Sequence, residues 1–350
     1  MASLPSTYRA FRRNADSTSI ELSTEKLPKV EELGAHDVVL KIHAVSLNFR
    51  DVAMIHGRYP ASVLDRGVVA SDCGAEVVAF GVSVTNFKAG DRVTSQFASK
   101  TETWARDCTF NALGGEVNGV LAEYAVFPED QLLLIPDHLS YEEASTLACA
   151  GLTAWNALKA PGLFAKDATV LLQGTGGVSM FGLLLAIAAG IKPIISSSSD
   201  EKLEAIKKLS PSIMGYNYRK NPDQAAEVKR LTDGLGVDIV VNNSGPGSIP
   251  GDIASLAAAD GAITMVGFLE GFGGDWEPSL LLSLMRKRAS IQGIAVGWIS
   301  EFEEFLQFIN EKKINLQPLI DSRIFTFDES KEAFDYLYSG KHVGKVIIKL

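Results

Sequence analysis

The sequence predicts an α/β protein in which a doubly wound parallel sheet is combined with a second, β-rich domain. Residues 168–203 hold a short apolar run, a glycine turn, a long apolar stretch and a second apolar run. Further short buried-type runs, at 237–241 and 262–268, alternate with helical stretches, as a parallel sheet requires. Residues 8–127 instead hold short alternating runs separated by glycine-containing turns. A chain of 350 residues is long enough to form both domains.

The glycine turn follows the predicted strand 169–173 and precedes a predicted buried helix at 180–189, and a second strand is expected at 193–197. Such a turn lets the backbone approach a dinucleotide pyrophosphate, and the helix N-terminus offers unpaired N–H groups to the anion. Ser179 takes the third glycine position of the fingerprint and is small enough to allow close packing. We expect the pyrophosphate to be bound by the turn residues Gly174, Thr175, Gly176, Gly177 and Val178.

The end of the second strand indicates which dinucleotide binds. An NAD site usually has Asp or Glu about 20 residues past the glycines, but Ser196, Ser197 and Ser198 stand there. Hydroxyls with Lys202 nearby suit a 2′-phosphate, which a carboxylate would repel, so the prediction is NADPH. Two alternatives stay open: Ser198 and Glu201 also form a capping box for a helix at 200–209, and Asp200 could turn toward the ribose.

The remaining elements follow from the same patterns. Capping boxes at Ser140–Glu143 and Ser300–Glu303 indicate the starts of two helices. Residues 101–118 have no clear hydrophobic period, which indicates a loop. Strands are expected at 8–20, 37–46, 77–84, 91–94, 121–127, 291–296 and 343–349. Helices are expected after residue 47, after residue 140, and at 148–159, 300–313 and 334–338.

Composition excludes several classes of protein. The net charge of −9 argues against a nucleic-acid partner. The three cysteines, Cys73, Cys108 and Cys149, have no CxxC spacing and suggest a reducing compartment. Neither a membrane span nor a secretory signal is evident, so a cytoplasmic enzyme is expected.

Several motifs together resemble the medium-chain dehydrogenase/reductases, in the zinc-independent, quinone-oxidoreductase-like and enoyl-reductase-like branch. The motifs, in chain order, are LNFRD at 47–51, GRYP at 57–60, GDRV at 90–93, AGLTAW at 150–155, QGTGGV at 173–178, VD at 237–238 and GKV at 344–346. The resemblance implies a GroES-like catalytic domain made of residues 1–150 and 298–350, and a Rossmann domain at 151–297. It also implies a homodimer in which the last Rossmann strand pairs with its twin.

The sequence departs from this family at the zinc ligands. Zinc-dependent relatives bind a catalytic zinc with Cys, His and Cys, and the matching positions here look like Asn48, Ser71 and Cys149, with Asp72 beside Ser71. One thiolate does not make a zinc site, so no metal is expected; Cys149 is then a small buried residue. The structural-zinc lobe needs four cysteines, and the matching loop offers Cys108.

A missing Lewis acid favours reduction of an activated C=C bond, whose enolate charge hydrogen-bond donors can stabilise. The resemblance implies Tyr59 as substrate anchor or proton donor, and Asn48 is positioned to donate an amide N–H to the substrate oxygen. The alternatives are a packing role for Tyr59 and a helix N-cap for Asn48, with Arg50 and Asp51 as an ion pair. The substrate is expected to be a small electrophile: an enone, a quinone or an enoyl thioester. Metal-free carbonyl reduction and NADPH binding without turnover are the competing functions.

The resemblance also implies further cofactor contacts. Lys202 and Tyr218 match residues near the 2′-phosphate, and Thr153 matches a nicotinamide contact. Gly267 and Phe268 match the backbone that lines the nicotinamide and its ribose, and Lys345 matches a position near the pyrophosphate or the dimer edge.

Overall fold

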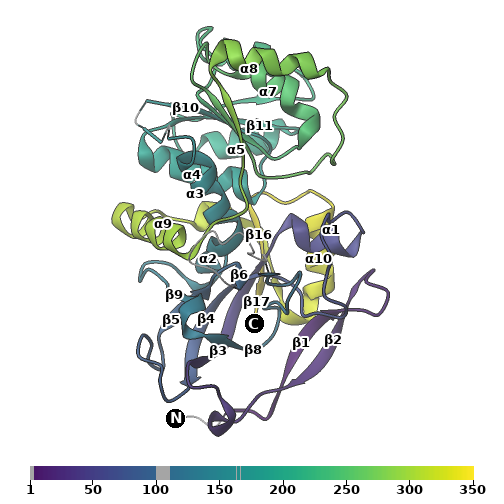
Figure 1. Ribbon diagram of the computed structural model, residues 1–350, viewed down its shortest axis with the longest axis vertical. Coiled ribbons are helices and arrows are strands. Elements are labelled where there is room, and N and C mark those ends of the chain that lie inside the picture. The colour runs from purple at the N-terminus through teal and green to yellow at the C-terminus, as the bar shows by residue number, and fades with distance from the viewer. Residues whose placement is uncertain (1–3, 100–110, 163, 166) are drawn as a thin grey trace. The chain divides into compact units, whose positions relative to one another are not determined.

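In the computed structural model, which describes residues 4–99, 111–162, 164–165 and 167–350, the chain divides into two units (Figure 1). The first, called the β-rich unit below, consists of Met1–Cys149 and Trp298–Leu350. The second, called the parallel-sheet unit, consists of Ala150–Gly297. The β-rich unit therefore contains both ends of the chain.

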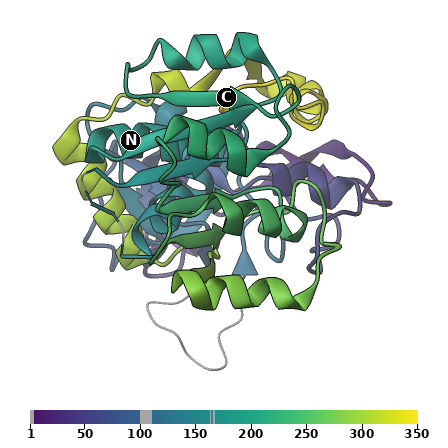
Figure 2. The ribbon, with the colours of Figure 1, turned by 90° about the horizontal axis from the view of Figure 1, so that it is seen from above.

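The parallel-sheet unit is built on six strands in the order β12-β11-β10-β13-β14-β15, each paired in parallel with its neighbours. The strands are β10 (Thr169–Leu172), β11 (Lys192–Ser197), β12 (Met214–Asn217), β13 (Ile239–Asn242), β14 (Ala262–Met265) and β15 (Ser290–Gly293). The helices, which lie on both faces of the sheet (Figure 2), are α3 (Leu152–Lys159), α4 (Gly177–Ala189), α5 (Asp200–Lys207), α6 (Gln224–Leu231), α7 (Ile249–Ser255) and α8 (Leu281–Lys287), with η4 (Pro246–Ser248) and η5 (Pro278–Leu280). This strand order confirms the predicted doubly wound sheet.

The strand order reverses between β10 and β13, and at such a switch point ligands bind beyond the carboxyl ends of the strands. The sheet is buried on both faces: Leu171 and Val240 are partners on one face, and Leu172 and Val241 are partners on the other. The rigid core therefore fixes where β10, β11, β13 and β14 end.

The β-rich unit contains a seven-stranded sheet, in which β16-β17-β3-β4-β5-β9 are neighbours and β8 pairs with β3. Its described strands are β1 (Thr7–Arg13), β2 (Ile20–Lys26), β3 (Asp37–Leu47), β4 (Asp72–Phe80), β5 (Arg92–Ser95), β6 (Ala98–Ser99), β7 (Asn111–Ala112), β8 (Tyr124–Pro128), β9 (Leu132–Leu134), β16 (Ile320–Thr326) and β17 (Lys345–Lys349). Its helices are α1 (Phe49–Ile55), α2 (Tyr141–Ala144), α9 (Ile299–Lys312) and α10 (Ser330–Tyr338), with η1 (Val30–Glu32), η2 (Glu129–Gln131), η6 (Gln317–Leu319) and η7 (Phe327–Glu329). A π-helical turn, η3 (Leu147–Gly151), leads into α3.

Strand β17 joins the end of the chain to the end of β3. The two strands pair antiparallel, with Val346 opposite Leu47. This register brings Lys345, at the start of β17, next to Asn48, although 297 positions separate them in the sequence.

The structure corrects several predicted boundaries. The run at 8–20 is not one strand, because it contains most of β1, a turn and the first residue of β2, and β1 and β2 pair as an antiparallel hairpin. The box at Ser140–Glu143 is confirmed, but the one at Ser198–Glu201 is wrong, because Ser199 is the N-cap and accepts the Lys202 backbone N–H at 3.2 Å. Similarly, Glu301, rather than Glu303, closes the start of α9 by accepting the Trp298 N–H at 2.8 Å. In serine-rich and glutamate-rich stretches the box pattern fits several registers, and tertiary packing selects among them.

Two predictions remain partly or wholly outside the fold just described. The predicted loop 101–118 falls largely outside the described residues, and Cys108 lies wholly outside them.

Within the described part of the chain, no helix combines the length and the apolar character needed to cross a membrane.

Candidate active site and cofactor site

The glycine turn lies directly after β10, at the switch point of the parallel sheet. Gly174 has a φ of +80°, which favours glycine, and Gly176 is the N-cap of α4. A Cβ on either glycine would meet no atom of the described residues within 4 Å, so the space beside this backbone is open. Thr175 is buried between the two glycines, while Gly177 and Val178 begin α4 and present its first N–H groups. The turn thus fits a pyrophosphate group.

A buried polar network ties the turn to the neighbouring strand, and sequence reasoning missed it. The Gln173 side chain accepts the Asn243 backbone N–H at 3.1 Å and donates to Asp252 Oδ1 at 2.7 Å. Asn242 donates to the other oxygen of Asp252 at 2.6 Å. Burial raises the pKa of Asp252, and hydrogen bonds from Gln224, Ser248, Asn242 and Gln173 oppose this rise. The network fixes the carboxyl ends of β10 and β13 relative to each other.

Ser179, at the third glycine position, also joins this network. Its hydroxyl donates to the Gln173 carbonyl at 2.7 Å and accepts a hydrogen bond from the Asn243 amide at 3.1 Å. The third glycine of the fingerprint normally allows the helix to pack closely on the strand. In this chain, the Ser179 hydroxyl joins the two through hydrogen bonds instead. The polar residues at both strand ends, Gln173 and Asn242–Asn243, were the signal available in the sequence.

The predicted 2′-phosphate residues gather at the ends of β11 and β12. Ser197 lies opposite Asn217 in the parallel ladder, and the Tyr218 backbone N–H donates to the Ser197 carbonyl at 3.0 Å. The Ser197 side chain is buried and accepts the Ser199 N–H at 3.2 Å. Ser198 is half-buried and, contrary to the predicted capping box, does not cap α5.

Asp200, the alternative ribose ligand, is held by neighbouring side chains. Its carboxylate accepts a hydrogen bond from Asn217 at 2.8 Å and pairs with Lys220. The Lys220 and Asn217 hydrogen bonds lower the pKa of Asp200, so it stays ionised at neutral pH. Lys202 is half-buried in the first turn of α5, the helix that follows the end of β11.

Arg219 is a further cation at this strand end that the sequence prediction did not include. The Asn217 side chain accepts the Arg219 backbone N–H at 3.0 Å and so forms a tight turn after β12. This turn exposes Tyr218, Arg219 and Lys220 in succession. Arg219 directly follows the Tyr218 that the resemblance implied, which is the signal that could have identified it.

Gly267 and Phe268 follow β14. A Cβ on Gly267 would lie 2.7 Å from the Asn243 carbonyl oxygen, so close approach to the loop after β13 requires glycine here. Phe268 stacks on Phe272 with ring centroids 4.9 Å apart. Thr153 lies buried on α3 of the same unit. The contacts of these residues with a cofactor stay predictions.

In the β-rich unit, the positions matched to zinc ligands form a hydrogen-bonded network with a lysine. Lys345 donates to Asn48 Oδ1, and Asn48 Nδ2 donates to Ser71 Oγ at 3.4 Å. Ser71 in turn donates to Asp72 Oδ1 at 2.6 Å, and Lys345 Nζ lies 3.7 Å from Asp72 Oδ2. We call Asn48, Ser71, Asp72 and Lys345 the lysine network. Asn48 is the N-cap of α1 by position, but its side chain faces this network.

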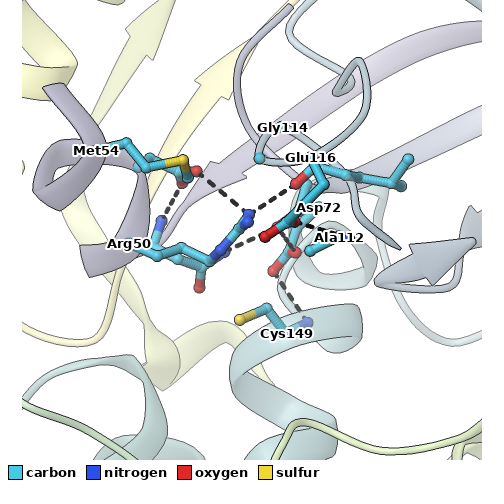
Figure 3. A network of polar contacts seen from close by, with 12 residues as sticks. Arg50, Met54, Asp72, Ala112, Gly114, Glu116 and Cys149 are labelled. Carbon is cyan, nitrogen blue, oxygen red and sulfur yellow. Dashed lines mark hydrogen bonds and ion pairs between the residues drawn. The ribbon is translucent and has the colours of Figure 1, made fainter. Parts of the chain in front are cut away.

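Cys149 borders the lysine network through its backbone. Its N–H donates to Asp72 Oδ2 at 3.2 Å, and Figure 3 shows the two residues facing each other with Arg50 beside them. Burial raises the pKa of the Cys149 thiol, as does the Asp72 charge, so the thiol is protonated at neutral pH. The described residues contain no group of three His, Cys, Asp or Glu side chains arranged to hold a metal ion.

Tyr59 lies against a buried arginine. The Arg50 guanidinium carbon lies 5.3 Å from the centre of the Tyr59 ring and 4.8 Å from that of Phe97. Arg50 donates to the Leu113 carbonyl at 2.7 Å, and its Nη1 lies 3.9 Å from Asp51 Oδ1, which is the expected ion pair. Asp51 also accepts the Asn48 backbone N–H at 2.8 Å. One short helix, α1, therefore connects the surroundings of Tyr59 to Asn48.

Comparison with known proteins follows the division of the chain. A family model described as "Alcohol dehydrogenase GroES-like domain" matches residues 34–137, and one described as "Zinc-binding dehydrogenase" matches residues 177–311. A zinc-type alcohol dehydrogenase-like protein of Schizosaccharomyces pombe is 37% identical over 94% of this chain and 95% of its own length.

Solved structures share the fold of this chain. A protein of Sinorhizobium meliloti assigned as an alcohol dehydrogenase is 34% identical with a TM-score of 0.88, covering 99% of this chain and 100% of that one. A 2-octenoyl-CoA carboxylase reductase, solved in complex with NADP and 2-octenoyl-CoA, is 22% identical with a TM-score of 0.84, covering 99% of this chain and 88% of that one. The second likeness shows the fold alone.

Proposed function

Because the chain belongs to the medium-chain dehydrogenase/reductase superfamily, we propose that it is an NADPH-dependent reductase of activated C=C bonds that acts without catalytic zinc. The superfamily makes it an oxidoreductase that uses a nicotinamide cofactor. The lysine network carries the finer proposal, because an amide and a hydroxyl stand at two of the positions matched to zinc ligands, and the Lys345 ammonium donates to that amide.

The chemistry of these groups favours an enolate over an alkoxide. Reduction of a simple carbonyl places full negative charge on one oxygen, which relatives stabilise with a Lewis acid. Hydride addition to the β-carbon of an enone, quinone or enoyl thioester spreads the charge into an enolate, for which hydrogen-bond donors suffice. Asn48 and Tyr59 are the proposed donors to that oxygen.

The parallel-sheet unit has the features that NADPH requires. The open backbone at Gly174 and Gly176, at the start of α4, would hold the pyrophosphate. Ser198, Lys202, Tyr218 and Arg219 would surround the 2′-phosphate at the ends of β11 and β12. The engagement of Asp200 with Lys220 and Asn217 supports NADPH over NADH, because the ionised carboxylate is already paired with a cation and an amide of the protein. When bound, the cofactor supplies the hydride.

The edge of the parallel sheet supports the proposed homodimer. Ser290 and Ile294 donate their backbone N–H groups to the Gly261 and Met265 carbonyls, so the backbone N–H groups of the alternate residues Ile291 and Gly293 point to the open edge of the sheet. Most of β15 is exposed, and the nearby α8 exposes Leu281, Leu282 and Met285. Pairing of β15 with its twin would cover both the open edge and these side chains.

The test is oxidation of NADPH or NADH by the purified, chelator-treated protein with a quinone, an enone, its saturated ketone and an enoyl thioester in parallel. We expect chelator-resistant turnover that prefers NADPH and spares the saturated ketone. Equal turnover of the saturated ketone would favour carbonyl reduction. Tight NADPH binding without turnover of any acceptor would favour a non-catalytic role, and activity lost with chelator would reveal a metal-dependent reaction.

A further inference from the structure

We infer that Lys345 is a positioning residue that fixes the direction of the Asn48 amide, so that its N–H end is available to the substrate oxygen. This inference rests on the proposed function and gives Lys345 a role different from the predicted one near the pyrophosphate or the dimer edge. The carrying observation is the lysine network, in which the donor and acceptor roles of each group are determined.

The direction of the Asn48 amide follows from its two neighbours. A lysine ammonium has three donors and no acceptor, so the Asn48 atom facing Lys345 must be the carbonyl Oδ1. At the other side, the Ser71 hydroxyl gives its one proton to the Asp72 carboxylate at 2.6 Å, so it accepts from the Asn48 side chain. Both contacts require the same orientation of the amide, with Nδ2 pointing away from Lys345.

This orientation leaves one amide proton for a ligand. Nδ2 carries two protons, and one is directed to Ser71 Oγ at 3.4 Å. Within the described part of the chain, Nδ2 makes no second hydrogen bond, and Asn48 as a whole residue is 9% exposed. A reversed amide would present a carbonyl to the substrate oxygen instead, and two acceptors repel each other.

Lys345 also strengthens the donor that it orients. Its ammonium is 2% exposed and lies 3.7 Å from the fully buried Asp72. A charged group that donates to an amide carbonyl polarises the amide, which makes its N–H groups stronger donors in a low-dielectric surrounding. The chain therefore supplies an internal positive charge behind the donor that faces the substrate.

The test is a double-mutant cycle between Lys345→Gln and Asn48→Asp. Glutamine both donates and accepts, so it no longer fixes the amide, whereas Asn48→Asp keeps an acceptor for Lys345 but removes the N–H donor. We expect each single variant to lower kcat about tenfold or more with the Kd for NADPH unchanged. In the Asn48→Asp background, Lys345→Gln should have little further effect, because Lys345 acts through Asn48.

Two variants control for structural damage. Lys349→Gln changes an exposed lysine of the same strand, paired with Glu142, and should keep wild-type kcat. Lys345→Arg restores a donor-only cation and should recover part of the lost kcat. Thermal melting curves identify any variant that fails to fold. Equal losses of kcat from Lys345→Gln in the wild-type and Asn48→Asp backgrounds, or no loss at all, would overturn the inference.

A readout that needs no turnover separates this inference from the proposed function. The side-chain amide signal of Asn48 in a ¹H–¹⁵N NMR spectrum is identified by its loss in Asn48→Asp. It should shift strongly in Lys345→Gln and stay in place in Lys349→Gln. An unshifted signal in Lys345→Gln would overturn the inference even if the protein turned over no acceptor, whereas lack of turnover with a shifted signal would count against the proposed function alone.

Discussion

At the scale of single residues, we propose that side chains near the strand ends select between NADPH and NADH. Ser197 and Ser198 remove the carboxylate typical of an NAD site, and Arg219 adds an exposed guanidinium one residue after Tyr218. A planar guanidinium matches phosphate geometry and is charged at all relevant pH values. Arg219 is therefore the residue that should discriminate most strongly between the two dinucleotides.

We predict that Arg219→Ala raises the Kd for NADPH tenfold or more, about 1.4 kcal/mol, and leaves the Kd for NADH unchanged. Isothermal titration with each dinucleotide measures both values. Arg230→Ala, which removes an exposed arginine paired with Glu227 on α6, is the matched control and should change neither. Equal weakening of NADH and NADPH binding by Arg219→Ala would show that Arg219 does not contact the 2′-phosphate.

Asp51 is a residue whose burial has a consequence for stability. Desolvation raises its pKa to about 6, against an opposing effect of Arg50, whereas in the unfolded chain it titrates near the ordinary value of 3.8. The folded state therefore binds more protons than the unfolded state between these values. The contribution of Asp51 to the free energy of unfolding therefore falls by up to about 3 kcal/mol as the pH rises from about 4 to about 6.

Asp51→Asn should remove this pH dependence. Urea unfolding at pH 4.5 and pH 7 gives the free energy of unfolding of both proteins. The difference between Asp51→Asn and wild type should shift in favour of the variant when the pH is raised from 4.5 to 7. Carboxylates with lowered pKa values, such as Glu25 and Glu329, are common to both proteins and cancel in the difference. A difference that stays constant between the two pH values would contradict a raised pKa for Asp51.

At the scale of elements, α4 has a glycine with a left-handed backbone conformation near each of its ends. Gly174 precedes the helix with a φ of +80°, and Gly190 is its C-cap with a φ of +78°. Alanine is strained to a similar extent at both positions. A Cβ on Gly174 would meet no described atom within 4 Å, and the pyrophosphate is proposed to bind at this end of the helix.

Gly174→Ala and Gly190→Ala should each lower the free energy of unfolding by about 1–2 kcal/mol. We expect the Kd for NADPH to rise at least tenfold in Gly174→Ala, because its methyl group would occupy phosphate space, and to stay unchanged in Gly190→Ala. Fluorescence titration with NADPH provides the values. Equal affinity of the two variants would mean that the pyrophosphate does not lie against this turn.

The sequence predicted elements better than it predicted the contacts among their side chains. The strand, glycine turn and helix at Thr169–Leu172 and Gly177–Ala189 follow a local pattern, and the structure confirms them. The partnership of Lys345 with Asn48 depends on the pairing of β17 with β3, and no local pattern encodes that register. The contact of Gln173 with Asp252 likewise depends on a strand order that sets β10 beside β13.

At the scale of the whole molecule, the proposed dimer depends on the outer edge of β15. The backbone N–H of Gly293 points away from β14 to the open edge, and a Cβ on Gly293 would meet no described atom within 4 Å. Alanine at this position keeps the outward N–H group and proline removes it. The pair of variants therefore separates loss of the backbone donor from loss of glycine.

We predict a dimer of twice 37.6 kDa for the wild type and for Gly293→Ala, and a monomer for Gly293→Pro. Light scattering coupled to size exclusion gives the masses, and circular dichroism shows whether each variant keeps its fold. A dimeric Gly293→Pro protein with unchanged affinity would place the dimer contact elsewhere.

The central claim, hydride addition to a C=C bond, is tested most directly by following the hydride itself. The chelator-treated protein is given NADPH carrying deuterium at the transferable C4 position together with an enone, and the product is analysed by mass spectrometry and NMR. The lysine network predicts a saturated ketone with deuterium on the β-carbon. An unsaturated alcohol with deuterium on the former carbonyl carbon would contradict it.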